Sequence, residues 1–428
     1  MALLESRVML LAAGLAMVVV SGCACEAPSP RAPRGVRPPP VAVIPKMGPE
    51  VPVIRVKLGD DAAGFAVAVA GPWRLAGASG DAASGELLDW TEVKVQDGKV
   101  LFGSPAPVAG PVELRSDRDA GVWIRQTVDG AARERGYRGI LRLAPTSTGL
   151  LRAVNVVPME EYIAAVVPVE LLKPWHVEAY KAQAVAARTY ALIQKNQKSR
   201  YDFDVYDSVS DQVYGGCGAE TLRAWEAVQG TWGVVATSRG AGGNPVLLKT
   251  YYSSTCGGET ASAAGVFGGE APPPLAGGVE CTWCRKSPKY TWPPLALTKQ
   301  EIGDVLRRSG TKDLARLGRV RSVEVAERAS RGGRADQIRI VDAAGQAYLL
   351  RAGYWRMLMG PKRVRSTWFD IQDAGDRILL KNGRGDGHGV GLCQWGAEYL
   401  AEHGKTAEEI LRYYYPGVEL VKAYERGK

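Results

Sequence analysis

Residues 158–194, PMEEYIAAVVPVELLKPWHVEAYKAQAVAARTYALIQ, contain an apolar run, a single acid at its end and a long alanine-rich segment. The run IAAVVPV continues the strand-like pattern of the preceding residues, so we expect a strand that ends at Glu170. A Leu-Leu-Lys-Pro turn follows. The small and apolar residues of AQAVAARTYAL then predict a largely buried helix with Pro174 in its first turn.

Glu170 has two interpretations within this segment. An acid at the end of an apolar run is costly to ionise, so its pKa should rise, and a protonated carboxyl near neutral pH suits a general acid in glycosidic bond cleavage. Alternatively, Glu170 is a partly solvated acid at a strand end, or a partner for a helix N-terminus. The segment alone does not decide between them.

The N-terminus predicts export. Arg7 precedes the apolar run VMLLAAGLAMVVV, which is too short for a comfortable transmembrane helix, so residues 1–22 are interpreted as a signal peptide. Val20-Ser21-Gly22-Cys23 resembles a bacterial lipobox, in which Cys23 is acylated. Residues 23–52 are Pro-rich and predict an extended, lipidated tether. We therefore expect a membrane-anchored lipoprotein of the cell envelope, facing the periplasm or the exterior.

Composition adds little about function. The net charge of +9 arises from 54 basic and 45 acidic residues and would suit an anionic polymer such as a cell-wall glycan, a membrane surface or nucleic acid. The basic residues are not concentrated in one run, so a solvated surface explains the charge equally well.

The rest of the chain predicts an α+β fold with mixed sheets. Short strands bounded by turn residues, such as VIRVKL, FAVAVA and ILRLAP, make residues 53–149 a β-rich N-terminal part. Residues 150–422 combine strands with helices around the alanine-rich segment, and we expect a catalytic cleft between subdomains. Thr406 and Glu409 predict a capping box at the start of the last helix.

Five cysteines lie beyond the tether, in a chain predicted to enter a disulfide-permissive compartment. Cys281 and Cys284 form a C-x2-C pair that could be half of a zinc site, completed by Cys256 with Cys217 or Cys393. One or two disulfides with a free buried thiol explain the same residues.

Two glycine-rich motifs are candidates for ligand contact. His388 lies within Gly387–Gly391, where the glycines allow close approach of a ligand. The run SSTCGGET, residues 253–260, follows a predicted strand and is either a ligand-contacting turn or a simple polar turn. The same residues also allow a cysteine peptidase in which Cys256 or Cys393 pairs with His388, although no orienting Asn or Asp is evident.

These blocks together resemble the stage II sporulation protein D family, which also contains the amidase-enhancer proteins. The resemblance rests on EEYIAAVVPVE with KAQAVAARTYAL, on LLKTYYSSTCGGET with SPKYTW, and on RSTWF with GHGVGLCQWGAEYLAEHGKTAEEILRYYYPG. With the VIRVKL and YRGILRL strands, it spans about residues 50–422.

The resemblance implies a lytic transglycosylase that cuts the MurNAc–GlcNAc bond of peptidoglycan, notably in glycan stripped of its stem peptides. The catalytic acid of the family's V-x-x-E-[ML] segment corresponds to Glu170, although Leu-Leu-Lys-Pro replaces the usual Met-Pro after it. His388, Gln394, Ser254 and Cys256 match family motif positions and are expected in one cleft. We assign Ser253, Tyr252 and Arg188 to substrate binding as well.

The resemblance also bears on partners and cofactors. Some relatives bind zinc near this cleft and others do not, so no cofactor is required but zinc fits the cysteines. The expected partners are peptidoglycan glycan strands, an amidase and the membrane through the lipid anchor, with no nucleic acid. The main alternative is a non-catalytic wall-binding protein that stimulates an amidase.

Overall fold

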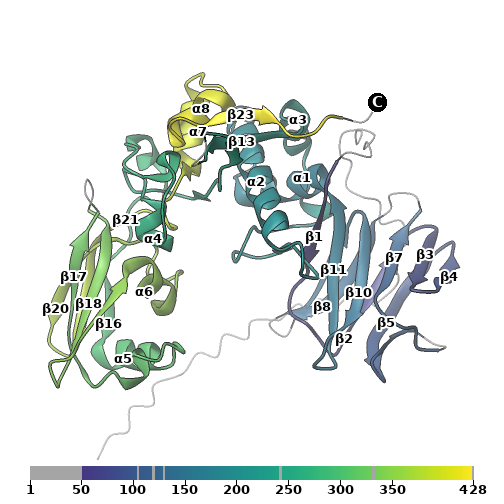
Figure 1. The fold of residues 1–428 in the computed structure, drawn as a ribbon, viewed down its shortest axis with the longest axis horizontal. Helices are drawn as coiled ribbons and strands as arrows, with labels where there is room; N and C mark the ends of the chain where they lie inside the picture. The colour runs from purple at the N-terminus through teal and green to yellow at the C-terminus, as the bar shows by residue number, and fades with distance from the viewer. Residues whose placement is uncertain are drawn as a thin grey trace, which may run out of the picture.

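The computed structural model describes residues 51–103, 106–117, 121–128, 131–240, 243–329 and 333–426 (Figure 1). These residues form several sheets and eight α-helices, which confirms the predicted α+β class. No helix in this part of the chain is both long and apolar enough to cross a bilayer. The predicted signal peptide, the acylated Cys23 and nearly all of the tether lie outside the described residues and stay predictions.

The strands of residues 53–149 lie in two sheets, the first of which also contains β11 and β12 from later in the chain. The first has the strand order β12-β1-β11-β10-β7-β3-β4 and is mixed, because β12 pairs in parallel with β1. Its strands are β12 (Val205–Tyr206), β1 (Val53–Lys57), β11 (Leu151–Pro158), β10 (Ile140–Pro145), β7 (Val112–Ser116), β3 (Trp73–Gly77) and β4 (Gly80–Gly85). The second sheet consists of β6 (Lys99–Phe102), β5 (Leu88–Gln96), β2 (Gly64–Val69), β8 (Val122–Val128) and β9 (Ala131–Tyr137).

The apolar run before Glu170 is helical, so the predicted strand there is wrong. β11 ends at Pro158, and helix α1 (Met159–Glu170) begins directly after it. Glu160 and Glu161 place negative charge at the positive end of the helix dipole. Nearly every residue of α1 is buried, and a continuous apolar run does not distinguish a buried strand from a buried helix.

The alanine-rich segment forms the predicted buried helix, α2 (Val177–Gln197), at the centre of the molecule (Figure 1). It starts later than predicted, because His176 is the N-cap and its Nδ1 accepts a hydrogen bond of 3.2 Å from the Glu178 N–H. Pro174 therefore lies in the connecting turn. The small side chains of α2 allow close packing against α1, α3 and α7.

The C-terminal half contains one group of elements around α2 and a second group on the far side from the N-terminal sheets (Figure 1). The elements around α2 are α3 (Leu222–Gly230), β13 (Val234–Arg239), β14 (Pro245–Leu247), β15 (Tyr252–Ser253), β22 (Leu392–Cys393), α7 (Gln394–Glu402), α8 (Ala407–Tyr414) and β23 (Glu419–Lys422). The short helix α4 (Ala263–Phe267) contacts the second group. The second group is β16 (Leu295–Thr298), α5 (Lys299–Arg307), β17 (Val320–Arg328), β18 (Ala335–Asp342), β19 (Ala347–Arg351), α6 (Ala352–Met359), β20 (Trp368–Ala374) and β21 (Arg377–Arg384).

The described residues contain three hydrophobic cores. One joins the N-terminal sheets to α1 and α3, a second surrounds α2, α7 and α8, and a third lies between the sheets of β16–β21 and helices α5 and α6. The first core includes residues on both sides of position 149, where the sequence suggested the end of the N-terminal part. The predicted capping box at Thr406 is confirmed at the start of α8.

A buried ion pair joins α1 to α2. The Arg188 guanidinium donates to both carboxylate oxygens of Glu160 at 2.9 and 2.6 Å, and neither side chain is exposed. Glu160 also accepts hydrogen bonds from the Gly233 N–H at 3.0 Å and the Tyr424 hydroxyl at 2.7 Å. This network ties the first two helices to the C-terminal end of the chain.

Removing only the arginine should be costly. In Arg188→Met the Glu160 carboxylate stays buried without its cation, so we expect the free energy of unfolding to fall by about 3–5 kcal/mol. Arg188→Met combined with Glu160→Leu should recover part of this loss, because no buried charge remains. Urea titration followed by circular dichroism measures both variants. A change below about 0.5 kcal/mol in the single variant would contradict the stabilising role of the pair.

Candidate functional site

Two short strands bring the glycine-rich motifs together. β15 and β22 pair in parallel, with Tyr252 opposite Leu392 and Ser253 opposite Cys393. The pairing places SSTCGGET beside GHGVGLCQWG, although more than a hundred residues separate them in the sequence. Gln394 directly follows β22 as the first residue of α7.

Glu170, the last residue of α1, lies beside these strands. Its Oε1 accepts a hydrogen bond of 3.1 Å from the Val213 N–H. Burial raises the pKa of Glu170, and hydrogen bonds from Val213, Gln394 and Tyr252 oppose part of that rise. These partners are all neutral, so the raised pKa comes from burial and not from a neighbouring carboxylate.

The two side chains beside Glu170 are themselves held in place. The Tyr252 hydroxyl accepts a hydrogen bond of 2.8 Å from the Gln212 amide, whose oxygen accepts from the Tyr162 hydroxyl at 3.1 Å. The Gln394 amide donates to Gln183 on α2 at 3.5 Å. Sequence reasoning identified Tyr252 and Gln394 but missed Gln212 and Val213, because their segment has no periodicity or motif that marks it.

Ser253, Ser254 and His388 stabilise the turns around the paired strands. The Ser253 hydroxyl accepts from the Gly389 N–H at 3.1 Å, and the Ser254 carbonyl accepts from the Trp395 N–H at 3.1 Å. His388 Nδ1 accepts from the Val390 N–H at 3.0 Å. The predicted residues Tyr252, Ser253, Ser254, His388 and Gln394 therefore lie on one pair of strands and the turns next to it.

The His388 imidazole is neutral near pH 7. Burial, followed by the charges of Arg356 and Arg334, lowers its pKa to about 3. Among the described residues no hydrogen bond joins His388 to Cys256 or Cys393, and both thiols are completely buried. This geometry does not favour the cysteine peptidase considered above.

Arg188 lies apart from this site. Its guanidinium is completely buried against Glu160 and also donates to the Val234 carbonyl at 3.0 Å. Since no atom of the side chain is exposed, the position favours a structural role over the substrate contact predicted from the sequence.

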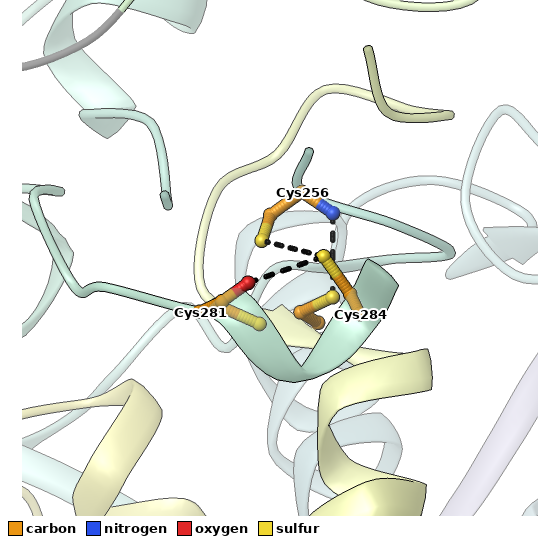
Figure 2. Close-up of side chains that lie close together, drawn as sticks. Cys256, Cys281 and Cys284 are labelled. Atoms are coloured by element: carbon orange, nitrogen blue, oxygen red, sulfur yellow. Dashed lines mark hydrogen bonds between the residues drawn. The ribbon is translucent and has the colours of Figure 1, made fainter. Parts of the chain in front are cut away.

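Four cysteines converge behind β15 and β22 (Figure 2). The sulfur atoms of Cys256, Cys281, Cys284 and Cys393 all lie within 4.8 Å of one another, and those of Cys256 and Cys284 are 3.7 Å apart. All four are buried free thiols. They come from the turn after β15, from the short 3-10 helix at Thr282–Lys286 and the residue before it, and from β22.

Cys217 is not part of this cluster. It is a buried free thiol beside Gly136 and Gly121, which belong to the N-terminal sheets and their turns. The sequence left Cys217 and Cys393 as alternative fourth members, and the structure selects Cys393. Burial raises the pKa of the Cys217 thiol to about 11, which favours an inert, protonated sulfur.

Polar groups surround the cysteine cluster. The Cys256 N–H donates to the Cys393 sulfur at 3.3 Å, and the Tyr414 hydroxyl lies 3.1 Å from the Cys281 sulfur. The buried Arg334 guanidinium donates to the Cys256 carbonyl, and its charge interacts with the thiols of the cluster. These groups resemble those that stabilise thiolates around bound metals.

Comparison with known proteins identifies the family of this chain. The model of the family described as stage II sporulation protein matches residues 147–237, which contain α1, α2 and α3. A stage II sporulation protein D of Bacillus amyloliquefaciens is 30% identical over 308 residues, covering 68% of this chain and 83% of that protein. The chain therefore belongs to the stage II sporulation protein D family.

Two further relatives extend the comparison. An uncharacterised protein of Brachyspira hyodysenteriae is 35% identical over 294 residues, which cover 67% of this chain and 72% of that protein. The amidase enhancer of Bacillus subtilis is 28% identical over 300 residues, but the match covers only 40% of that longer protein. The resemblance noted from the sequence is thus confirmed at the level of the family.

The hydrogen bonds from Tyr252 and Gln394 should lower the pKa of Glu170, and this effect can be tested. Tyr252→Phe or Gln394→Met removes a hydrogen bond that favours the carboxylate, so each should raise the pKa of Glu170 further. Carbon-13 NMR titration of glutamate-labelled protein, with the resonance assigned from Glu170→Gln, measures the shift. Tyr251→Phe is the matched control and should leave the pKa unchanged. An unchanged or lower value in the first two variants would contradict the described contacts.

Proposed function

We propose that this protein is a lytic transglycosylase that cleaves the MurNAc–GlcNAc bond of peptidoglycan glycan strands. The observation that carries the proposal is Glu170, a half-buried carboxyl group at the end of α1 with a raised pKa and only neutral hydrogen-bond partners. Membership of the family, with relatives named stage II sporulation protein D and amidase enhancer, supports a function in the cell wall. Acylation at Cys23 would hold the protein at the cell envelope.

In the proposed reaction, protonated Glu170 donates its proton to the glycosidic oxygen as the bond to MurNAc C1 breaks. An oxocarbenium-like centre develops at C1. The resulting carboxylate then takes the proton of the MurNAc C6 hydroxyl, whose oxygen attacks C1. The products are a free GlcNAc 4-hydroxyl and a 1,6-anhydro-MurNAc end, and Glu170 regains its proton.

This mechanism suits a single carboxylate. Ordinary glycosidases use two carboxyl groups, one as acid and one as nucleophile or base. Here the attacking group belongs to the substrate, so a second carboxylate is dispensable. Tyr252 and Gln394 would hold Glu170 in position, and burial would favour its protonated form.

The catalytic acid can be tested directly. Glu170→Gln keeps the shape of the side chain but removes the acid, so release of anhydro-muropeptides or anhydro-disaccharides should fall at least about 100-fold. In the wild-type protein the rate should decline as pH rises through the raised pKa, because the protonated fraction falls. Mass spectrometry of digested glycan measures the products, both on intact sacculi and on sacculi treated with an amidase.

The control for this test is Glu408→Gln, which changes an exposed glutamate of α8 that pairs with Arg412. It should digest glycan at the wild-type rate. Anhydro products released by Glu170→Gln at the wild-type rate would refute the assignment of the acid.

A second candidate function comes from the amidase enhancer of Bacillus subtilis. In this alternative the same site would hold glycan without cutting it and would stimulate a partner amidase. Binding alone produces no anhydro ends. Wild-type protein that binds glycan and stimulates an amidase, but yields no anhydro ends, would therefore favour the enhancer.

We also propose that the four clustered cysteines hold a structural zinc ion. A tetrahedron with Zn–S bonds of about 2.3 Å has sulfur–sulfur edges of about 3.8 Å, close to the 3.7 Å between Cys256 and Cys284. Four protein ligands leave no open position, so the ion would be structural. Arg334 would offset the negative charge of the thiolates. The ion would fix β22, and with it Gln394, beside β15.

Metal analysis tests the zinc proposal. Purified protein should contain about one zinc per chain, and Cys281→Ser combined with Cys284→Ser should lose it and lower the melting temperature. Cys217→Ser, outside the cluster, should keep the metal. Disulfides predict a different result: without reductant, the four cysteines of denatured protein would resist alkylation. That resistance, or wild-type protein without metal after expression with zinc, would refute the site.

A further inference from the structure

Lys249 has an unusual position next to the proposed site. It is half-buried, between β14 and β15, and its Nζ lies 5.7 Å from the ring centre of Tyr190 and 5.4 Å from that of Tyr251. Among the described residues it forms no ion pair with a carboxylate. Burial lowers the pKa of its ammonium group, and the charge of Asp211 opposes only part of that fall.

Asp211, the carboxylate whose charge acts on Lys249, already has other partners. It accepts hydrogen bonds from the Tyr190 hydroxyl at 3.1 Å and the Tyr206 N–H at 2.9 Å, and also from the Gln194 amide. Its ion pair is with Lys198, at 3.3 Å. Lys249 therefore offers a cation on an aromatic support to an anion that comes from outside the protein.

The aromatic rings around Lys249 form a continuous row, which we call the aromatic platform: Tyr190, Tyr251 and Phe267. Tyr190 and Tyr251 meet edge to face at 6.3 Å, and Tyr251 stacks on Phe267 at 4.4 Å. Phe267 is 44% exposed, and the His388 ring lies 5.3 Å from it. An exposed aromatic ring with a polar group nearby suits the apolar face of a sugar ring.

One short segment connects the aromatic platform to Glu170. Asp211 binds the Tyr190 hydroxyl, Gln212 binds Tyr252, and the Val213 N–H binds Glu170. Tyr251 of the platform also directly precedes Tyr252, which bonds Glu170. The platform therefore adjoins the surroundings of the acid, and a single glycan strand could contact both.

We propose that Lys249 and the aromatic platform form a subsite for a MurNAc unit whose lactyl carboxylate is free. This inference rests on the proposed function, because it places the glycan strand at Glu170. In glycan that carries stem peptides the lactyl group ends in a neutral amide with a bulky chain. After an amidase has removed the peptide, it ends in a carboxylate that the Lys249 ammonium can bind. Lys249 is thus a specificity-determining residue that favours peptide-free glycan.

Binding to a protein that cannot cleave tests this subsite. In the Glu170→Gln background, Lys249→Met should weaken binding of peptide-free glycan strands about tenfold or more, because a charge-assisted hydrogen bond is lost. Lys249→Arg should keep more of the affinity. On the same glycan with its carboxylates converted to carboxamides, the Lys249→Met variant and its parent should bind equally. Isothermal titration calorimetry measures each protein with both glycans.

The matched control is Lys405→Met, which removes the same charge from an exposed lysine near the start of α8 that pairs with Glu409. It should leave binding of both glycans unchanged, and a thermal melt of each variant checks folding. Equal binding of peptide-free glycan by the Lys249→Met variant and its parent would overturn the subsite, even if the wild-type protein releases anhydro products. A carboxylate-dependent effect of Lys249 without anhydro products would support the subsite and refute the proposed reaction.

Discussion

The parallel pairing of β15 with β22 is the contact on which the candidate site depends. Each strand is only two residues long, so their own hydrogen bonds contribute little stability. Two sets of contacts support the pairing. Cys256 and Cys393 join the two strand regions through the cysteine cluster, and Ser253 and His388 accept hydrogen bonds from the turn before β22. Tyr252 belongs to β15, Gln394 directly follows β22, and both bond Glu170. Any shift in the strand pairing would therefore move two hydrogen-bond partners of Glu170.

The environment of Glu170 follows from packing in the rest of the molecule. α1 is buried nearly all round, and the Glu160–Arg188 pair fixes it against α2. The acid thus ends a rigid helix, where low polarity favours its neutral form. The donors to Glu170 are neutral, so no positive charge beside it favours the ionised carboxylate. In the proposed mechanism, the packing that stabilises α1 also favours the protonated form of Glu170.

Much of the fold could be predicted from the sequence, because strands such as β1, β2, β7 and β10 are short apolar or alternating runs bounded by turn residues. The apolar run before Glu170 was wrongly predicted as a strand, because a buried helix and a buried strand can have the same composition. Glu170, Tyr252 and Gln394 lie in recognisable motifs, whereas Gln212, Val213 and Lys249 meet them only through tertiary contacts. The fourth cysteine of the cluster likewise depended on which strand pairs with β15.

Digestion of peptide-free glycan in water enriched with heavy oxygen, followed by mass spectrometry, tests the central claim most directly. If Glu170 transfers the proton and the MurNAc C6 hydroxyl attacks C1, the new MurNAc ends are 1,6-anhydro sugars that carry no heavy oxygen. If water is the nucleophile, each new reducing end gains one water and carries the heavy oxygen with it. Labelled reducing ends, or no cleavage at all, would contradict the account of Glu170 as the sole acid and base of a transglycosylase.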